Sequence, residues 1–86
     1  MEMNWQVYII ICSDDTLYTG ITIDPQRRFQ QHAKGEGAKY FRARKPVRIA
    51  YLEGGHTRSS AGKREAEIKS TSRAEKMLLI EVNSGS

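Results

Sequence analysis

Two tyrosines lie ten residues apart in the stretch VYIIICSDDTLYTGI, residues 7–21, where two apolar, β-branched runs flank a polar centre. This pattern predicts two paired strands joined by a turn. If the turn is the three-residue loop Ser13-Asp14-Asp15, then Tyr8, Tyr18 and Gly20 share one face; a two-residue loop would split the tyrosines between faces. A shared face would offer a ligand two phenols, with open space at the glycine. Alternatively, both are amphipathic strand residues with their hydroxyls at the rim.

Arg28 and His32 lie four residues apart in a segment with helical spacing, so they share one face of the predicted helix. A guanidinium near the start of a helix adds its donors to the positive end of the helix dipole, which suits a phosphate. His32 could carry a proton or donate to a phosphate. We expect Phe29 and Ala33 to face the core and Arg27 to point elsewhere. A solvated helix charge is the alternative for Arg28.

Glu65 falls at helical spacing with Ile68, on the apolar side of a second predicted helix, whereas Glu67 faces water. A carboxylate on the inward side needs a partner. That partner is either an ion pair with Lys69 or Arg64, or a hard divalent cation. Mg²⁺ suits the second alternative because it takes one or two protein carboxylates and keeps water or phosphate oxygens as its other ligands.

The surrounding pattern predicts one small domain that positions these residues. Strands are expected at residues 5–12, 16–23 and 47–53, and helices at 25–34, from 57–60 to 69, and at 73–82. Asp24-Pro25 marks the start of the first helix, and Gly54-Gly55 is expected to close the third strand. One helical turn is expected near Tyr40. Residues 1–82 would then form the domain, with 83–86 as a flexible tail.

The composition is that of a soluble globular protein, with 38% hydrophobic and 28% charged residues and no apolar run long enough to span a membrane. Cys12 is the only cysteine, which excludes an internal disulfide and favours a reducing compartment. We expect it to be a small core residue. The start of the sequence lacks the pattern of a secretory signal, so we expect a cytoplasmic protein with no membrane partner.

The net charge of +4 is unevenly distributed along the chain. No Lys or Arg precedes Arg27, whereas residues 27–48 contain eight, against the single acidic residue Glu36. A one-sided field of this kind suits a polyphosphate, and a solvated basic face is the alternative. We expect the basic loop, the segment from Lys39 to Arg48, to contact a nucleic-acid backbone without reading its sequence. The contacting residues would be Lys39, Tyr40, Arg42, Arg44 and Lys45.

Motif, spacing and order together resemble the GIY-YIG endonuclease superfamily. The resemblance rests on VYII followed by YTG, on Arg28 ten residues after Tyr18, and on a glutamate within REAEIK. The stretches LYTGITIDPQRRFQQH, GEGAKYFRARKP and RAEKMLLI are similar, more narrowly, to its small stand-alone bacterial members, which are related to the nuclease domain of the excision-repair nuclease. The resemblance covers about residues 5–80.

This resemblance implies an α+β fold, a three-stranded antiparallel sheet flanked by helices in the order β-β-α-β-α-α, and hydrolysis of phosphodiester bonds in DNA repair or processing, with DNA expected over RNA. It implies one Mg²⁺ or Mn²⁺ held by Glu65, with Arg28 clamping the scissile phosphate. Tyr18 would be the general base, Tyr8 would orient the water or the phosphate, and His32 would make a supporting contact. An unperturbed phenol titrates near pH ~10, so the cation and Arg28 would have to lower that value.

The competing interpretation is a nucleic-acid-binding module that keeps the fold but cuts nothing, or works only with a protein partner. A structural role with accidental basicity is a third. An inward glutamate favours the enzyme, because a binder needs Lys and Arg but no such carboxylate. The sequence leaves the substrate structure, weak self-association and the pathway open. We expect Tyr8, Tyr18, Arg28 and Glu65 to converge on one solvent-reachable concavity.

Overall fold

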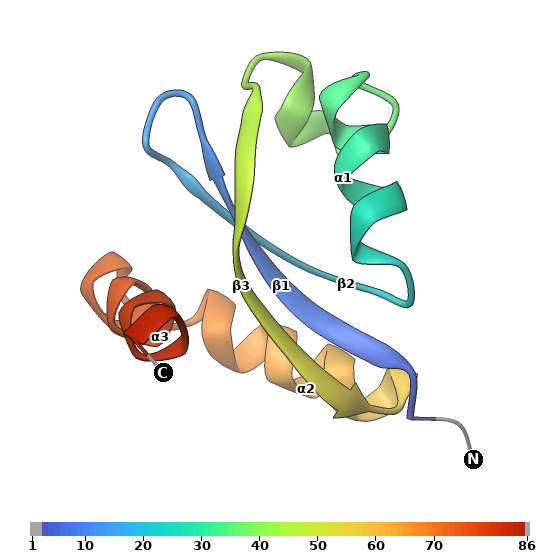
Figure 1. Cartoon of the computed structure of the whole chain (residues 1–86), viewed down its shortest axis with the longest axis vertical. Coiled ribbons are helices and arrows are strands. Elements are labelled where there is room, and N and C mark those ends of the chain that lie inside the picture. Colours follow the sequence, from blue (N-terminus) through green and yellow to red (C-terminus); the bar gives the residue numbers. More distant parts are fainter. Residues whose placement is uncertain (1–2, 86) are drawn as a thin grey trace.

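A computed structural model describes residues 3–85 of the chain, with side chains up to residue 83. The elements are β1 (Trp5–Cys12), β2 (Leu17–Thr22), α1 (Pro25–Ala33), the 3₁₀ turn η1 (Lys39–Arg42), β3 (Pro46–His56), α2 (Arg58–Lys69) and α3 (Arg73–Gly85). The strands form one antiparallel sheet in the order β2-β1-β3. Helix α1 and η1 lie on one face of this sheet, and α2 and α3 lie on the other (Figure 1). The predicted fold class is confirmed.

Two boundaries differ from the prediction by more than one residue. Strand β3 does not close at Gly54-Gly55 but continues to His56, which pairs with Trp5. Gly55 adopts a φ of 75°, a backbone conformation that glycine reaches at little energetic cost. The strand register shifts beside it, so the glycine pair forms a β-bulge and does not end the strand. Helix α3 continues to Gly85, so three of the four residues assigned to the tail are helical. Ser86 lies outside the described residues.

A three-residue loop closes the first hairpin. The Cys12 N–H donates to the Thr16 carbonyl at 2.9 Å, and the Asp15 N–H donates to the Cys12 carbonyl at 3.0 Å. Asp15 has a φ of 66°, the left-handed conformation that ends a three-residue hairpin loop. The Asp14 carboxylate accepts from the Thr16 hydroxyl at 2.6 Å and holds the loop further. The turn is therefore Ser13-Asp14-Asp15, the odd alternative.

This loop sets the register that the tyrosines need. Tyr8 lies opposite Gly20, and Ile10 lies opposite Tyr18. Because side chains alternate between faces, an odd loop brings both tyrosines to the same face. The predicted shared face is confirmed, and it is the face covered by α1 and η1.

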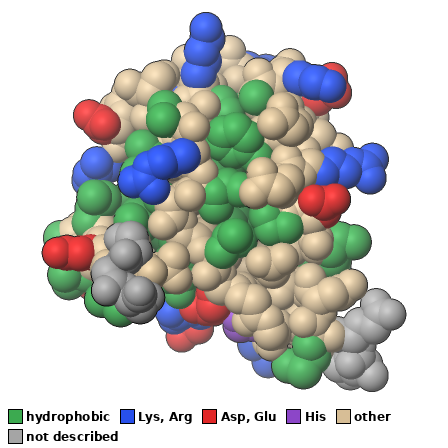
Figure 2. Space-filling view, viewed as in Figure 1, with side chains coloured by type: hydrophobic (Ala, Val, Ile, Leu, Met, Phe, Trp, Pro, Cys, Tyr) green, Lys and Arg blue, Asp and Glu red, His purple; other side chains and the backbone are tan. Residues whose placement is uncertain are grey.

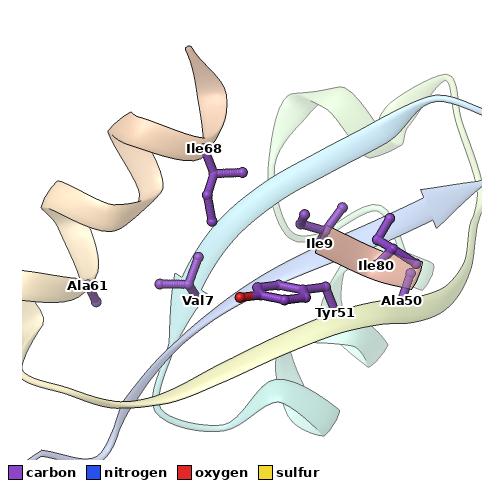
Figure 3. Packing of buried hydrophobic residues seen from close by; sticks show 7 residues of the cluster. All are labelled: Val7, Ile9, Ala50, Tyr51, Ala61, Ile68 and Ile80. Carbon is purple, nitrogen blue, oxygen red and sulfur yellow. The ribbon is translucent and has the colours of Figure 1, made fainter. Parts of the chain in front are cut away.

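The sheet carries a core on each face. Figure 3 shows the core between the sheet and helices α2 and α3, formed by Val7, Ile9, Ala50, Tyr51, Ala61, Ile68 and Ile80. On the other face, Tyr8, Ile10, Cys12 and Phe41 form a smaller core under α1. Cys12 is 1% exposed, as expected of a core residue. The second core contains a predicted site residue, so packing and chemistry share this face.

The face of the molecule that is seen in Figure 1 carries both apolar and basic side chains. Figure 2 shows hydrophobic side chains in a strip down the middle of this face, with Lys and Arg side chains above the strip and on both sides of it. Within the described part of the chain, no helix is long and apolar enough to cross a membrane.

Candidate active site

Tyr8, Tyr18 and His32 meet on the α1 face of the sheet. The Tyr8 hydroxyl oxygen lies 2.9 Å from Nε2 of His32. The ring centroids of Tyr18 and His32 are 5.4 Å apart, and those of the two tyrosines 6.3 Å. Strands β1 and β2 thus supply the phenols, and α1 supplies the imidazole. Sequence reasoning placed these three residues correctly beside one another.

Gly20 is needed by Tyr8 itself rather than by a ligand. A Cβ atom added at Gly20 would clash with the hydroxyl and the ring of Tyr8. The phenol therefore lies directly over the glycine on the neighbouring strand. The expectation of open space for a ligand at Gly20 is wrong, because the tyrosine fills it.

His32 is the buried residue of α1. Its side chain is 0% exposed, whereas Ala33, expected to face the core, is exposed. The helix is thus turned so that His32 packs against Phe41, with ring centroids 4.2 Å apart. The expectation for Ala33 is wrong. The aromatic residues of η1 pack better against the large imidazole ring than they would against the methyl group of Ala33, so the helix buries His32 instead.

The loop after α1 closes around the imidazole. Nδ1 of His32 accepts a hydrogen bond from the Ala38 backbone N–H at 3.3 Å. A Cβ atom at Gly37 would clash with the same ring nitrogen, so only glycine allows the loop to come this close. Burial, with the nearby Arg28 charge, lowers the pKa of His32 to about 4. The residue expected to carry a proton is therefore neutral at physiological pH.

This lowered pKa predicts a pH-dependent stability. Between pH 6.5 and about 4 the unfolded chain binds a proton at His32 that the folded chain does not. The free energy of unfolding should therefore be flat with respect to His32 above pH 6.5 and fall as the pH drops toward 4, by up to about 3 kcal/mol. Denaturant titrations at several pH values measure this fall.

A His32→Gln variant is the control for that experiment, because glutamine has no titrating ring while the carboxylates stay the same. Its stability should fall less steeply over the same pH range. Equal slopes for the two proteins would contradict the assigned pKa shift.

Arg28 lies at a surface pocket. Its Nη1 donates to Oε1 of Gln31 at 3.1 Å, which holds the guanidinium along the helix. It lines a pocket of about 460 Å³ together with Trp5, Arg27 and Arg58. The expectation that Arg27 points elsewhere is wrong, since both arginines reach this pocket. Three guanidinium groups around one hollow favour an anionic ligand there.

Tyr8 is held as a neutral phenol. Burial, and after it the charge of Tyr18, raise the pKa of Tyr8 to about 12. A hydrogen bond from Arg28 and its charge act in the opposite direction, while the Glu65 charge raises the value slightly. At neutral pH Tyr8 keeps its proton. The mutual influence of these groups also places Glu65 within electrostatic reach of the tyrosine.

Glu65 takes the partner that the ion-pair alternative named. Its Oε2 lies 3.2 Å from Nζ of Lys69, and its side chain is 24% exposed. Arg64, the other named partner, is instead held by Glu53, with Nε donating to both carboxylate oxygens at 3.1 Å. Glu67 is 68% exposed, so it faces water as expected. The glutamate is half-buried rather than fully inward.

The two tyrosines lie side by side, and Arg28 and Glu65 act on Tyr8 through their charges, but the pocket at Arg28 does not bring the four residues into one open concavity. Tyr8 is 2% exposed. The pocket at Arg28 is not lined by Tyr8, Tyr18 or Glu65.

Comparison with known proteins decides the family. The profile of the GIY-YIG catalytic domain matches residues 4–78 of the chain. The chain belongs to the GIY-YIG family. Over 75 residues it is 53% identical to a UPF0213 protein of Haloquadratum walsbyi, covering 87% of this chain and 84% of that protein. Over 84 residues it is 51% identical to a UPF0213 protein of Syntrophus aciditrophicus, covering 96% and 95%.

A solved structure agrees with this assignment. The fold is similar to the solution NMR structure of a UPF0213 protein from Bacillus halodurans, with a TM-score of 0.61 and 41% sequence identity. The match covers 96% of this chain and 88% of that one. The resemblance to small GIY-YIG proteins is confirmed. The names of these relatives state no activity.

GIY-YIG nucleases generally depend on a divalent metal, and the residues of this GIY-YIG chain fit a hard cation held by few protein ligands. Glu65 offers one half-buried carboxylate, and Lys69, 53% exposed, is a partner that can move away. Within residues 3–85 no group of three or more His, Cys, Asp or Glu side chains could hold a metal together. A single carboxylate suits Mg²⁺ or Mn²⁺, which keep water and phosphate oxygens as their other ligands, and does not suit zinc.

The basic loop forms a second positive surface. Arg44 lies over the Tyr40 ring at 4.3 Å and pairs with Asp14 of the hairpin loop at 2.9 Å. Lys34, Arg42 and Lys45 join Arg44 around a pocket of about 390 Å³ at the end of α1. Phe41 is 4% exposed, so of the two aromatic residues in η1 only Tyr40 is placed to meet a ligand.

Sequence reasoning missed two parts of this site. Gly37 and Ala38 contact His32 through their backbone, which no side-chain pattern reports, although a glycine shortly after a helix is a signal for close approach. Trp5 and Arg58 reach the Arg28 pocket from β1 and α2, and Arg58 lies 5.5 Å from the Trp5 ring centroid. Their meeting depends on tertiary structure and leaves no local signal.

Proposed function

We propose that this chain is a metal-dependent endonuclease that hydrolyses phosphodiester bonds in DNA, with a role in DNA repair or processing. The observation that carries the proposal is the cluster of Tyr8, Tyr18, His32 and Arg28, with Glu65 in electrostatic reach, in a chain of the GIY-YIG family. A binding surface alone has no use for two phenols and an imidazole buried beside an arginine.

Each side chain has a role in this hydrolysis. Arg28 binds the scissile phosphate through its guanidinium and neutralises charge as the transition state forms. Tyr18, acting as the phenolate, takes a proton from the attacking water, whose oxygen bonds to phosphorus. The bond from phosphorus to the leaving 3′-oxygen breaks, that oxygen takes a proton from solvent, and Tyr18 returns its own extra proton to solvent. Tyr8 orients the phosphate or the water, and His32 holds Tyr8.

Glu65 would hold the Mg²⁺ or Mn²⁺ ion, which supplies stabilisation of negative charge on the leaving oxygen and the phosphate when bound. The half-buried position of the carboxylate keeps one side open to solvent. Lys69 would have to give up its pairing with Glu65 when the cation binds.

A cleavage assay tests the proposal. The protein is incubated with labelled single-stranded, nicked, flapped and branched DNA and with RNA, each with Mg²⁺, Mn²⁺ or EDTA. We expect metal-dependent cleavage of at least one DNA structure, and none in EDTA. No cleavage of any substrate, by a protein that still binds them, would favour the second candidate below.

The second candidate is a nucleic-acid-binding module that cuts nothing or needs a protein partner. One observation favours it, because Glu65 is already paired with Lys69 and Tyr8 is nearly inaccessible. The same assay separates the two candidates, since binding without cleavage under every metal condition is the result expected of the module.

The basic loop should bind the phosphate backbone without reading sequence. Neutralising Arg42, Arg44 and Lys45 together should weaken binding of every sequence by a similar factor and flatten its salt dependence, because fewer counterions are released per complex. Fluorescence anisotropy at about 50–200 mM salt measures this effect. We expect the wild-type affinity to be roughly micromolar or weaker at physiological salt.

The matched control removes three charges elsewhere: Lys63, Arg73 and Lys76 on α2 and α3. It changes the net charge equally but should change affinity less. If both triple variants bound alike, the loop would be only a solvated basic surface.

A further inference from the structure

His32 has one partner on each ring nitrogen, and together they determine which nitrogen carries the proton. The Ala38 backbone N–H faces Nδ1 at 3.3 Å, and the Tyr8 hydroxyl faces Nε2 at 2.9 Å. A backbone N–H can only donate, so Nδ1 must be the unprotonated acceptor. In a neutral imidazole the proton is then on Nε2.

This tautomer determines the direction of the hydrogen bond to Tyr8. With its proton on Nε2, His32 donates to the phenol oxygen. Arg28 lowers the pKa of the Tyr8 phenol, and a guanidinium has donors only. His32 therefore gives its hydrogen bond to the oxygen, and neither neighbour can accept the phenol's own proton.

We propose that the Ala38 amide fixes the His32 tautomer and thereby makes Tyr8 a hydrogen-bond donor to the substrate phosphate rather than a base. Ala38 is a positioning residue in this scheme, acting through His32. The identity of the acceptor rests on the proposed nuclease function, whereas the tautomer does not.

The surroundings of the ring support a single tautomer. His32 is 0% exposed, so water does not compete for either nitrogen. The absence of a side chain at Gly37 lets the loop amide reach Nδ1. The opposite tautomer would place the Nδ1 proton against the Ala38 N–H, donor against donor, in a buried site.

The resulting chain of donors runs in one direction. The Ala38 amide donates to His32, His32 donates to Tyr8, and Tyr8 is left to donate outward. In such a chain each hydrogen bond strengthens the next, and the last group, the Tyr8 hydroxyl, is suited to donate to an anion. It also separates the two tyrosines by role, which leaves Tyr18 as the base.

The tautomer can be measured directly in the wild-type protein. Long-range proton–nitrogen NMR correlation on ¹⁵N-histidine-labelled protein at neutral pH distinguishes protonated from unprotonated ring nitrogens. We expect Nδ1 of His32 in the unprotonated range and Nε2 in the protonated range. A protonated Nδ1 would overturn the inference. The spectrum of His32→Gln identifies which signals belong to His32 and which to His56.

A proline at position 38 replaces the amide proton with the Cδ atom of its ring, so Nδ1 loses its donor and faces a methylene group instead. Ala38 has a φ of −67°, close to the value that proline fixes, so the backbone can keep its course. In Ala38→Pro we expect the imidazole proton to shift toward Nδ1. Ala38→Gly, which keeps the N–H, should retain the wild-type tautomer. A folded Ala38→Pro with the wild-type tautomer would show that the amide does not set it, and the wild-type spectrum remains a test even if the proline variant does not fold.

Kinetics test the role assigned to Tyr8. If Tyr8 only donates, Tyr8→Phe should lower the cleavage rate by a similar factor at every pH. Loss of the rising limb of the pH–rate profile in this variant would make Tyr8 the base and overturn its role. An inactive wild-type protein with the expected tautomer would reject the nuclease, and with it a phosphate as the acceptor, but not the tautomer. An active one with the opposite tautomer would reject only the inference.

Discussion

Glu65→Gln should abolish metal-dependent cleavage while leaving the fold and DNA affinity nearly unchanged. The amide keeps the size of the carboxylate but loses the charge that would hold the cation, so the rate should fall by about 10³-fold or more. The lost ion pair with Lys69 lies on a partly exposed helix surface and contributes at most about 0.5 kcal/mol to stability. Single-turnover cleavage in Mg²⁺ and DNA binding in EDTA measure the two properties separately.

Glu67→Gln is the matched control, two residues away on the same helix. Its side chain is 68% exposed and lies 3.9 Å from Arg64, so removing its charge should change neither cleavage nor binding. If Glu65→Gln cut at the wild-type rate, Glu65 would not be the metal ligand. If both variants lost activity equally, the cause would be the charge of α2 as a whole.

The fold was predictable because its elements have local signals. Asp24 caps α1, with its carboxylate accepting from the Arg27 N–H at 3.1 Å, and Pro25 occupies the first turn. Strand β1 contains the apolar, β-branched run of residues 7–11. The two strand-pairing alternatives could not be separated by pattern alone. The hydrogen bond from Cys12 to Thr16 and the left-handed conformation of Asp15 decide for the longer loop.

The side chains of the site were predictable from the sequence, whereas the backbone contacts that hold them in place were not. Tyr8, Tyr18 and His32 meet, as the family resemblance implied. The closeness of Gly37 and Ala38 to the imidazole comes from the path of a loop, and backbone contacts leave no trace in side-chain periodicity. Burial of His32 in place of Ala33 was missed for a related reason. The spacing of apolar residues in a short helix does not reveal that an aromatic residue of η1 packs against one of its faces.

Gly20 was misread because its role depends on the neighbouring strand. A glycine in a strand indicates close approach, and the approaching group was taken to be a ligand. The register brings Tyr8 opposite Gly20, so the group is the phenol of the chain itself. Gly20 therefore belongs to the machinery that positions Tyr8, together with His32 and Arg28.

Gly20→Ala should consequently impair cleavage without removing a catalytic group. The added Cβ would clash with the Tyr8 hydroxyl and ring, and backbone pairing on β1 and β2 prevents the strands from separating. Tyr8 must then move, and its bond to His32 is lost or lengthened. A displacement of about 1 Å in such a site costs roughly 10²-fold in rate, and overpacking costs about 1–3 kcal/mol in stability.

Gly62→Ala provides the control, because a Cβ at that position meets nothing within 4 Å and Gly62 lies within helix α2. The same substitution there should keep the cleavage rate and raise the free energy of unfolding by about 0.5–1 kcal/mol. Denaturant titration and single-turnover cleavage measure both variants. Wild-type cleavage by Gly20→Ala would mean that Tyr8 can move away from position 20 without slowing the reaction. The positioning of Tyr8 by His32 would then have no catalytic consequence.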